Sequence, residues 1–194
     1  MNNEELQKLK ETTCQEYQLL ISWLNGYCPI LNGIVEIGVM RGDSARIWRS
    51  FLAPDGIYIG VDINLHDESQ HLYAEVGKVA ERYKDDKRMN FVIADSHNTD
   101  TVGKVKEVIG VAPIDFLFID GEHSYEGTKI DFENYSPLVK SGGIIVYHDA
   151  TRNSNVRRAI ADVIDVYEFN VPFKHYCQFD SKQGHCGIVV LVKE

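Results

Sequence analysis

The fold is decided by two stretches of the sequence, IDFLFIDGEHSY at residues 114–125 and SGGIIVYHD at residues 141–149. Each contains a continuous apolar run, at residues 116–119 in the first stretch and 144–146 in the second. Apolar runs of this length, without polar alternation, are typical of strands that are covered on both faces in a parallel sheet. We therefore predict that the two stretches form buried parallel strands.

Both predicted strands end in an aspartate and a histidine. Asp120 and His123 follow the first run, and His148 and Asp149 follow the second. Taken alone, each is explained by local structure, because an aspartate after a strand often caps a helix and a histidine near a glycine often completes a turn. Together they need another explanation, since like charges gathered at one sheet edge need a cation or protons to coexist. Open α/β folds bind ligands at this edge, so we interpret it as the rim of an active site.

The remainder of the chain alternates between predicted strands and helices. Further strands are expected at residues 34–37, 57–61 and 89–94, and helices at 44–52, 72–83, 101–109, 130–138 and 156–167. Loops and turns are expected at residues 32–33, 54–56, 64–69 and 141–143, and a hairpin at 173–179 and 187–192 around a turn at 181–184. This order predicts a doubly wound α/β domain whose mostly parallel, seven-stranded sheet ends in a C-terminal antiparallel hairpin.

Length and composition fit one domain. The 194 residues, 44% hydrophobic and 25% charged, are enough to bury a sizeable core, so we expect a single domain over residues 1–194 with 1–27 as an N-terminal helical extension. An apolar stripe in this extension predicts that it covers the site or packs against a second subunit in a homodimer. The stripe consists of Leu6, Leu9, Tyr17, Leu20, Trp23 and Leu24.

The charge and the cysteines exclude several classes of protein. A net charge of -9 disfavours broad attraction to nucleic acid or to an anionic membrane, so a small molecule is the expected partner. The N-terminus lacks an apolar signal core and no apolar run is long enough to span a membrane, which predicts a cytoplasmic protein. The four cysteines form no CxxC pair, so they indicate neither a zinc site nor a disulfide framework. Cys177 and Cys186 are expected as reduced thiols that could face each other across the hairpin.

A second candidate site lies in VEIGVMRGDSA, residues 35–45. Gly38 and Gly42 let a ligand approach the backbone, and a helix capped by Asp43 or Ser44 offers free N–H donors. The dinucleotide fingerprint GxGxxG is absent, because Met40 occupies its second glycine position. The loop therefore favours a ligand other than NAD.

Three acidic positions and one long motif carry a resemblance to a known family. Glu36 before the loop, Asp62 after the second strand and Asp95 after the third resemble class I S-adenosylmethionine-dependent methyltransferases, with ExGxxxG replacing their usual E/DxGxGxG. A more specific resemblance lies in residues 119–149, IDGEHSYEGTKIDFENYSPLVKSGGIIVYHD. They resemble the subgroup of macrolide-sugar O-methyltransferases and cephalosporin hydroxylase-like proteins, which is similar in fold to catechol O-methyltransferases. The resemblance covers residues 33–158 and implies a Rossmann-like methyltransferase fold.

The resemblance implies S-adenosylmethionine as the cofactor. Asp62 would accept both ribose hydroxyls, which requires two acceptor oxygens. Glu36 would position the loop near the methionine amino group, and Asp95 with Ser96 would approach the adenine. The implied cofactor-binding residues are Glu36, Gly38, Gly42, Ser44, Asp62, Asp95, Ser96 and Asp120.

The likeness to catechol-type enzymes also implies a divalent metal. Matching positions give Asp120, His148 and Asp149 as ligands, and Asp120 and His123 as the catalytic pair, with His123 the base. The family more often has an oxygen ligand at His148, and Mg²⁺ prefers oxygen, so either His148 points away or the ion is a borderline one such as Mn²⁺. Consecutive strand residues point to opposite faces, so His148 and Asp149 reach one ion only if the chain has left the strand. We therefore rank Asp120 and Asp149 above His148.

These observations predict a divalent-metal-assisted O-methyltransferase that uses S-adenosylmethionine on a small hydroxylated acceptor, a sugar or a natural product. One alternative is a metal-dependent oxygenase, in which His123, His148 and one aspartate hold Fe(II). That reading leaves the glycine loop unexplained. Another is a non-catalytic S-adenosylmethionine or nucleotide binder, which would keep Gly38 and Asp62 but would not need the pair Asp120 and Asp149.

Overall fold

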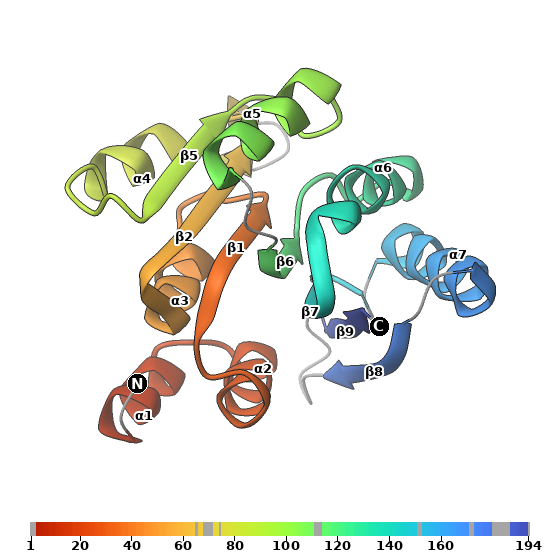
Figure 1. Ribbon diagram of the computed structural model, residues 1–194, viewed down its shortest axis with the longest axis horizontal. Coiled ribbons are helices and arrows are strands. Elements are labelled where there is room, and N and C mark those ends of the chain that lie inside the picture. Colours follow the sequence, from red (N-terminus) through yellow and green to blue (C-terminus); the bar gives the residue numbers. More distant parts are fainter. Residues whose placement is uncertain are drawn as a thin grey trace.

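A seven-stranded sheet forms the centre of the protein (Figure 1). The computed structural model describes residues 3–64, 66–67, 72–73, 75–110, 114–150, 153–170, 173–179 and 187–193. The sheet contains β1 (Leu31–Ile37), β2 (Leu52–Asp62), β5 (Met89–Ile93), β6 (Ile114–Ile119), β7 (Val139–Tyr147), β8 (Phe173–Phe179) and β9 (Ile188–Lys193), in the order β5-β2-β1-β6-β7-β9-β8. The first five strands pair in parallel, and β9 pairs antiparallel with both β7 and β8. The predicted architecture is confirmed.

Helices cover both faces of the sheet. The helices are α1 (Asn3–Glu11), α2 (Gln15–Tyr27), α3 (Asp43–Phe51), α4 (Val76–Arg82), α5 (Thr99–Ile109), α6 (Tyr125–Tyr135) and α7 (Ser154–Asn170). Apolar residues of α1 to α4 pack on one face, and those of α5 to α7 pack on the other (Figure 1). Phe116 and Phe118 of β6 belong to the first core and Leu117 and Ile119 to the second, so residues 116–119 are all apolar because this part of the strand is buried on both sides. No helix in the described ranges is long and apolar enough to cross a membrane.

The strand register brings the predicted site residues to one edge. Ile37 at the end of β1 pairs with Val61 of β2 and with Ile119 of β6, and Ile119 pairs with Tyr147 of β7. Backbone hydrogen bonds continue this pattern one residue further. The Asp120 N–H donates to the Ile37 carbonyl at 2.8 Å, and the His148 N–H donates to the Ile119 carbonyl at 3.1 Å. The residues that follow these strands therefore emerge side by side.

Several predicted local elements are wrong. Residues 32–33, 54–56 and 141–143 were expected in turns but lie inside β1, β2 and β7. The β1–β2 and β6–β7 pairings both shift register near these residues. The glycines and the proline therefore lie in irregular first segments of the strands rather than in turns. The helix expected over residues 72–83 begins only at Val76, because Leu72–Tyr73 forms β4, which pairs with β3 (His66–Asp67) inside the expected loop at 64–69.

The ends of the chain largely follow the expectation. The amphipathic N-terminal stretch forms two helices, and Leu20, Ile21 and Leu24 of α2 are fully buried against the sheet core. Helix α6 ends at Tyr135 and is followed by a short 3₁₀ turn, Ser136–Leu138, with Pro137 in its first positions. The C-terminal hairpin is present as β8 and β9. Its expected turn and Cys186 lie outside the described residues, and the predicted homodimer stays a prediction.

Candidate active site

A cavity of about 1070 Å³ opens at the carboxyl edge of the parallel strands. Its walls come from the loops after β1, β2, β5, β6 and β7, together with the turn between α1 and α2 and the start of α2. Of the predicted cofactor and metal residues, Gly38, Ser44, Asp62, Asp95, Ser96, Asp120, His123, His148 and Asp149 line it. Glu36 and Gly42 do not border this cavity.

The glycine loop after β1 is held in place by Asp62. One carboxylate oxygen of Asp62 accepts hydrogen bonds from the Val39 and Met40 N–H groups, each at 2.8 Å, and the other accepts from the Asn64 N–H at 2.6 Å. Each carboxylate oxygen has two acceptor sites, so Asp62 keeps capacity for further donors such as hydroxyls. Asp62 therefore both shapes the loop and faces the cavity.

Left-handed backbone conformations allow the loop to turn so tightly. Gly38 and Gly42 have φ values of 85° and 77°. A Cβ at position 38 would lie 2.1 Å from the Asp120 carbonyl oxygen, so only glycine fits where the β1 and β6 loops touch. Gly42 is the N-cap of α3, which corrects the prediction that Asp43 or Ser44 caps this helix. The Ser44 side chain instead interacts with Glu36.

Glu36 lies beneath the glycine loop rather than in the cavity. Its side chain is fully buried and accepts hydrogen bonds from the Trp48 indole N–H at 3.3 Å and from the Tyr58 hydroxyl. Burial raises the pKa of Glu36 to about 8 and outweighs the opposing effect of these donors. Glu36 thus links β1 to α3 and β2 inside the protein, and its predicted approach to the methionine amino group stays a prediction.

Asp120, His123 and Asp149 form a compact cluster at the other end of the cavity. The His123 Nε2 lies 3.2 Å from Asp120 Oδ1 and 3.4 Å from Asp149 Oδ2. One ligand atom from each of the three residues lies within 4.8 Å of the others, a spacing that could hold a metal ion. Asp149 has a φ of 53°, so the chain has left β7 when it reaches this residue. The cluster thus has two carboxylates and one imidazole directed at one point.

His148 lies directly behind the cluster. Its Nδ1 is 3.2 Å from Asp120 Oδ1 and 3.6 Å from Asp149 Oδ2, although neither ring nitrogen makes a hydrogen bond with a described residue. The His148 ring packs against Tyr17 and Phe118, with centroid distances of 5.4 Å and 6.1 Å. Its side chain is only 11% exposed. The structure thus directs His148 toward the carboxylates but holds it inside the aromatic packing.

The charges in the cluster shift one another's titration. Burial raises the pKa of Asp120, but His148 and His123 outweigh this effect and hold it below its usual range. The Asp120 hydrogen bond raises the pKa of His123 despite burial. Burial lowers the pKa of His148, yet the two carboxylates outweigh it and raise that pKa to about 10. Without another cation, the histidines therefore carry the positive charge that balances the carboxylates.

The loop after β5, residues 95–97, forms a third wall, and we call it the β5 loop. The Asp95 carboxylate accepts a hydrogen bond from the backbone N–H of His97 at 2.9 Å. The Asp95 side chain is 55% exposed, so it can still accept a hydrogen bond from a ligand. The Ser96 hydroxyl donates to Asp131 of α6 at 2.6 Å. His97 also lines the cavity.

The N-terminal extension closes the remaining side. Thr12, Cys14 and Tyr17 line the cavity, and the Arg46 guanidinium donates to the Thr12 hydroxyl at 3.1 Å, which ties this segment to α3. Tyr17 packs against Trp48 and Phe118 as well as His148. Sequence reasoning gave Tyr17 a place only in the apolar stripe and did not identify His97 or Asp131, because their partners are distant in the sequence.

Comparisons with known proteins identify the family of the chain. Residues 35–150 match a family model described as a methyltransferase domain. None of the curated proteins compared with the chain matches it.

Solved structures of methyltransferases share the fold. An O-methyltransferase from Bacillus cereus, in complex with SAH, is 18% identical, with a TM-score of 0.63 over 100% of this chain and 82% of that one. TomG from Streptomyces achromogenes, an O-methyltransferase of tomaymycin synthesis in complex with SAM, is 15% identical, with a TM-score of 0.67 over 100% and 91%. MycE of the mycinamycin pathway, in complex with Mg, SAH and mycinamycin VI, is 19% identical, with a TM-score of 0.62 over 97% and 53%.

Proposed function

The chain belongs to the family of methyltransferase domains, and on this premise we propose that it is a divalent-metal-assisted O-methyltransferase that uses S-adenosylmethionine. One observation carries the proposal. A single cavity has a glycine loop with an acidic partner at one end and a carboxylate–histidine cluster at the other. Its volume of about 1070 Å³ slightly exceeds the usual range for ligand pockets, roughly 300 to 1,000 Å³, as expected if cofactor and acceptor bind together.

The proposed cofactor would occupy the loop end. Asp62 would accept the ribose hydroxyls with the acceptor sites that its backbone bonds leave free. The β5 loop, with Asp95 and Ser96, would border the adenine. Gly38 and Ser44 would lie beside the methionine moiety. The complexes of TomG with SAM and of the Bacillus cereus enzyme with SAH support this assignment.

The chain's own residues would perform the proton chemistry at the cluster end. The two carboxylates of the cluster fit a divalent ion, and Asp120 and Asp149 would hold it while His123 stays free beside it. When bound, the ion supplies a Lewis acid that lowers the pKa of an acceptor hydroxyl. Its positive charge also weakens the hold of Asp120 on the His123 proton, so His123 would accept the hydroxyl proton as the base.

The acceptor is proposed to be a small hydroxylated molecule, a sugar or a natural product. The complex of MycE with mycinamycin VI supports this class. In this chain the acceptor would bind against the segment with Thr12, Cys14 and Tyr17, which lines the cavity and packs through Tyr17 against His148 beside the cluster. The alternative roles as an oxygenase or as a non-catalytic binder lack the support of the family match.

The test separates the cofactor from the metal. Calorimetric titration should show binding of S-adenosylhomocysteine and none of NAD. Chelation should then leave this binding nearly intact but abolish methyl transfer to hydroxylated acceptors, and added Mg²⁺ or Mn²⁺ should restore it. Electron paramagnetic resonance of Mn²⁺ gives a readout of the metal site that needs no acceptor. Tighter binding of NAD, or full activity in the chelated protein, would contradict the proposal.

A further inference from the structure

One buried carboxylate on α6 lies outside the roles described above. Asp131 is fully buried and does not border the cavity. Its Oδ1 accepts the Ser96 hydroxyl hydrogen bond. Its Oδ2 has no hydrogen-bond partner within the described part of the chain and lies beside Gly121, where a Cβ would be only 2.9 Å away. Burial of a carboxylate with so few hydrogen-bond donors is unfavourable, so the presence of an aspartate at this buried position needs a reason.

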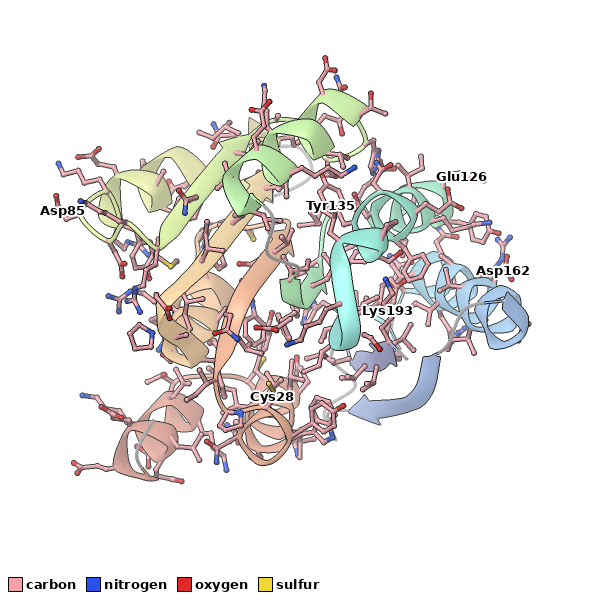
Figure 2. The ribbon with its side chains drawn as sticks, viewed as in Figure 1. Cys28, Asp85, Glu126, Tyr135, Asp162 and Lys193 are labelled. Atoms are coloured by element: carbon pink, nitrogen blue, oxygen red, sulfur yellow. The ribbon has the colours of Figure 1, made fainter. Side chains whose placement is uncertain are left out.

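Asp131 is one of three α6 side chains that form hydrogen bonds with the β5 loop. The Asn134 amide donates to the Ser96 and His97 carbonyls at 3.2 Å and 3.4 Å, and the Tyr135 hydroxyl donates to the Ser96 carbonyl at 3.1 Å. Residues three and four apart share one helix face. Tyr135 lies on the side of α6 that faces α5 and the sheet, whereas Glu126 lies on the outer side (Figure 2). This face of α6 therefore fixes the loop from within the protein.

The charge of Asp131 acts on His97. The His97 Nε2 lies 3.6 Å from Asp131 Oδ1, and its Nδ1 lies 3.8 Å from Glu122 and 3.9 Å from Asp95. Interaction with Asp131 is the main cause that raises the pKa of His97. The Glu122 and Asp95 side chains are more than half exposed, so water screens them, whereas Asp131 is fully buried. Asp131 is thus the nearest and least screened of the three carboxylates around the His97 ring.

We propose that Asp131 is a positioning residue that sets the β5 loop for recognition of the adenine ring and so contributes to the choice of base in the cofactor. The inference rests on the proposed function, in which adenosine binds beside this loop. Asp131 does not border the cavity, so it acts on the cofactor through residues that do, in particular Ser96 and His97 of the β5 loop. An asparagine could still accept the Ser96 hydrogen bond but carries no charge for His97. The carboxylate is therefore suited to hold the ring as well as the backbone.

The 6-position of the base is where a well-placed loop discriminates. Adenine carries a 6-amino donor there, and hypoxanthine carries a 6-oxo acceptor. The exposed Asp95 carboxylate accepts hydrogen bonds, so it favours the amino group and repels the oxygen. Such selection depends on how firmly the polar groups are held.

The test compares S-adenosylhomocysteine with its 6-oxo analogue, S-inosylhomocysteine, by calorimetric titration of the full chain. The wild type should prefer the adenine ligand by about tenfold or more, as hydrogen-bonding sites do. Asp131→Asn removes the charge beside His97, and Ser96→Ala removes the hydrogen bond that ties the loop to Asp131. Each variant should therefore reduce this preference to about threefold or less. Glu133→Gln, an exposed carboxylate on the same helix, is the matched control and should keep the preference.

The outcomes separate this inference from the function on which it rests. A wild type that binds neither ligand would overturn both. A wild type that prefers adenine, with Asp131→Asn weakening both ligands equally or not at all, would overturn the positioning role alone. If Asp131→Asn does not fold, Ser96→Ala decides, and an undiminished preference in that folded variant would overturn the proposal.

Discussion

The two ends of the cavity hold their carboxylates in opposite ways. At the loop end, Asp62 accepts three backbone N–H groups, whose charge is fixed and does not titrate. At the cluster end, Asp120 and Asp149 face histidine side chains, which gain and lose protons. This difference fits the proposed function, in which the loop end binds the neutral ribose and the cluster end releases protons when a metal ion binds.

Removing one carboxylate from the cluster should give the largest effect. Asp149→Asn leaves the ion with one strong ligand, so we expect Mn²⁺ binding and methyl transfer to be lost. Affinity for S-adenosylhomocysteine should stay within about twofold, because Asp149 is not among the residues proposed to bind the cofactor. Mn²⁺ resonance, calorimetry and transfer of a labelled methyl group measure the three quantities. Glu126→Gln, an exposed change on α6 (Figure 2), is the control. Unaltered Mn²⁺ affinity in Asp149→Asn would remove Asp149 from the proposed site.

Removing the base should have the next largest effect. His123→Ala is expected to lower turnover by roughly 10² to 10⁴, the usual contribution of a general base, while Mn²⁺ still binds. Steady-state transfer rates and Mn²⁺ resonance check both statements. Loss of Mn²⁺ binding in this variant would show that His123 is a metal ligand and would contradict its role as the base.

At the loop end the expected change is smaller. Asp62→Ala should weaken S-adenosylhomocysteine by about 1.5 to 3 kcal/mol, because it removes hydrogen bonds to the ribose and to the glycine loop. Calorimetry measures the loss of affinity. Asp62→Asn keeps one acceptor oxygen, so its affinity should lie between those of the wild type and Asp62→Ala. Mn²⁺ affinity should not change. Equal binding in the wild type and Asp62→Ala would show that the loop end has been assigned wrongly.

The smallest effect on binding is expected at Glu36, which tests whether the interior below the loop is neutral. Burial raises its pKa from the ordinary 4.5 to about 8, so between these values the folded protein holds a proton that the unfolded chain releases. Stability from this group is complete below pH 4.5 and is lost as the pH rises toward 8.

Glu36→Gln carries no titrating group at this position. Between pH 5 and 8, the wild type should therefore lose a few kcal/mol of unfolding free energy relative to this variant. Urea unfolding at the two pH values measures the difference. Parallel pH dependence in the two proteins would mean that Glu36 is ionised in the fold.

Much of the fold could be predicted because its signals are local. The apolar runs at 116–119 and 144–146 and the polar residues after them placed two strands and their shared edge, and the structure brings Asp120, His123 and Asp149 together there. Whether these residues act as proposed stays a prediction. The turns expected at 54–56 and 141–143 were wrong because turn-forming residues also fit irregular strand openings.

The missed residues depend on contacts between distant segments. Tyr17 lies 131 positions before His148, and Asp131 lies 35 after Ser96. One signal for Asp131 was available, since it shares a helix face with Thr128 and Tyr135, which are buried. A charged residue on a buried helix face indicates a polar contact inside the protein, but the sequence does not show which residue makes that contact.

The contact between Gly38 and the Asp120 carbonyl has a consequence for evolution and engineering. It joins the loop end of the cavity to the cluster end through backbone atoms. At this contact, the spacing between the two ends therefore does not depend on a side chain that mutation could change. The wall at Thr12, Cys14 and Tyr17 belongs to a separate segment. Under the proposed function, a lineage or a designer can therefore change the cavity-facing residues of this segment to accommodate a new acceptor, while the core residues of α2, Leu20, Ile21 and Leu24, are kept. The distance between the methyl donor and the cluster would then be inherited unchanged.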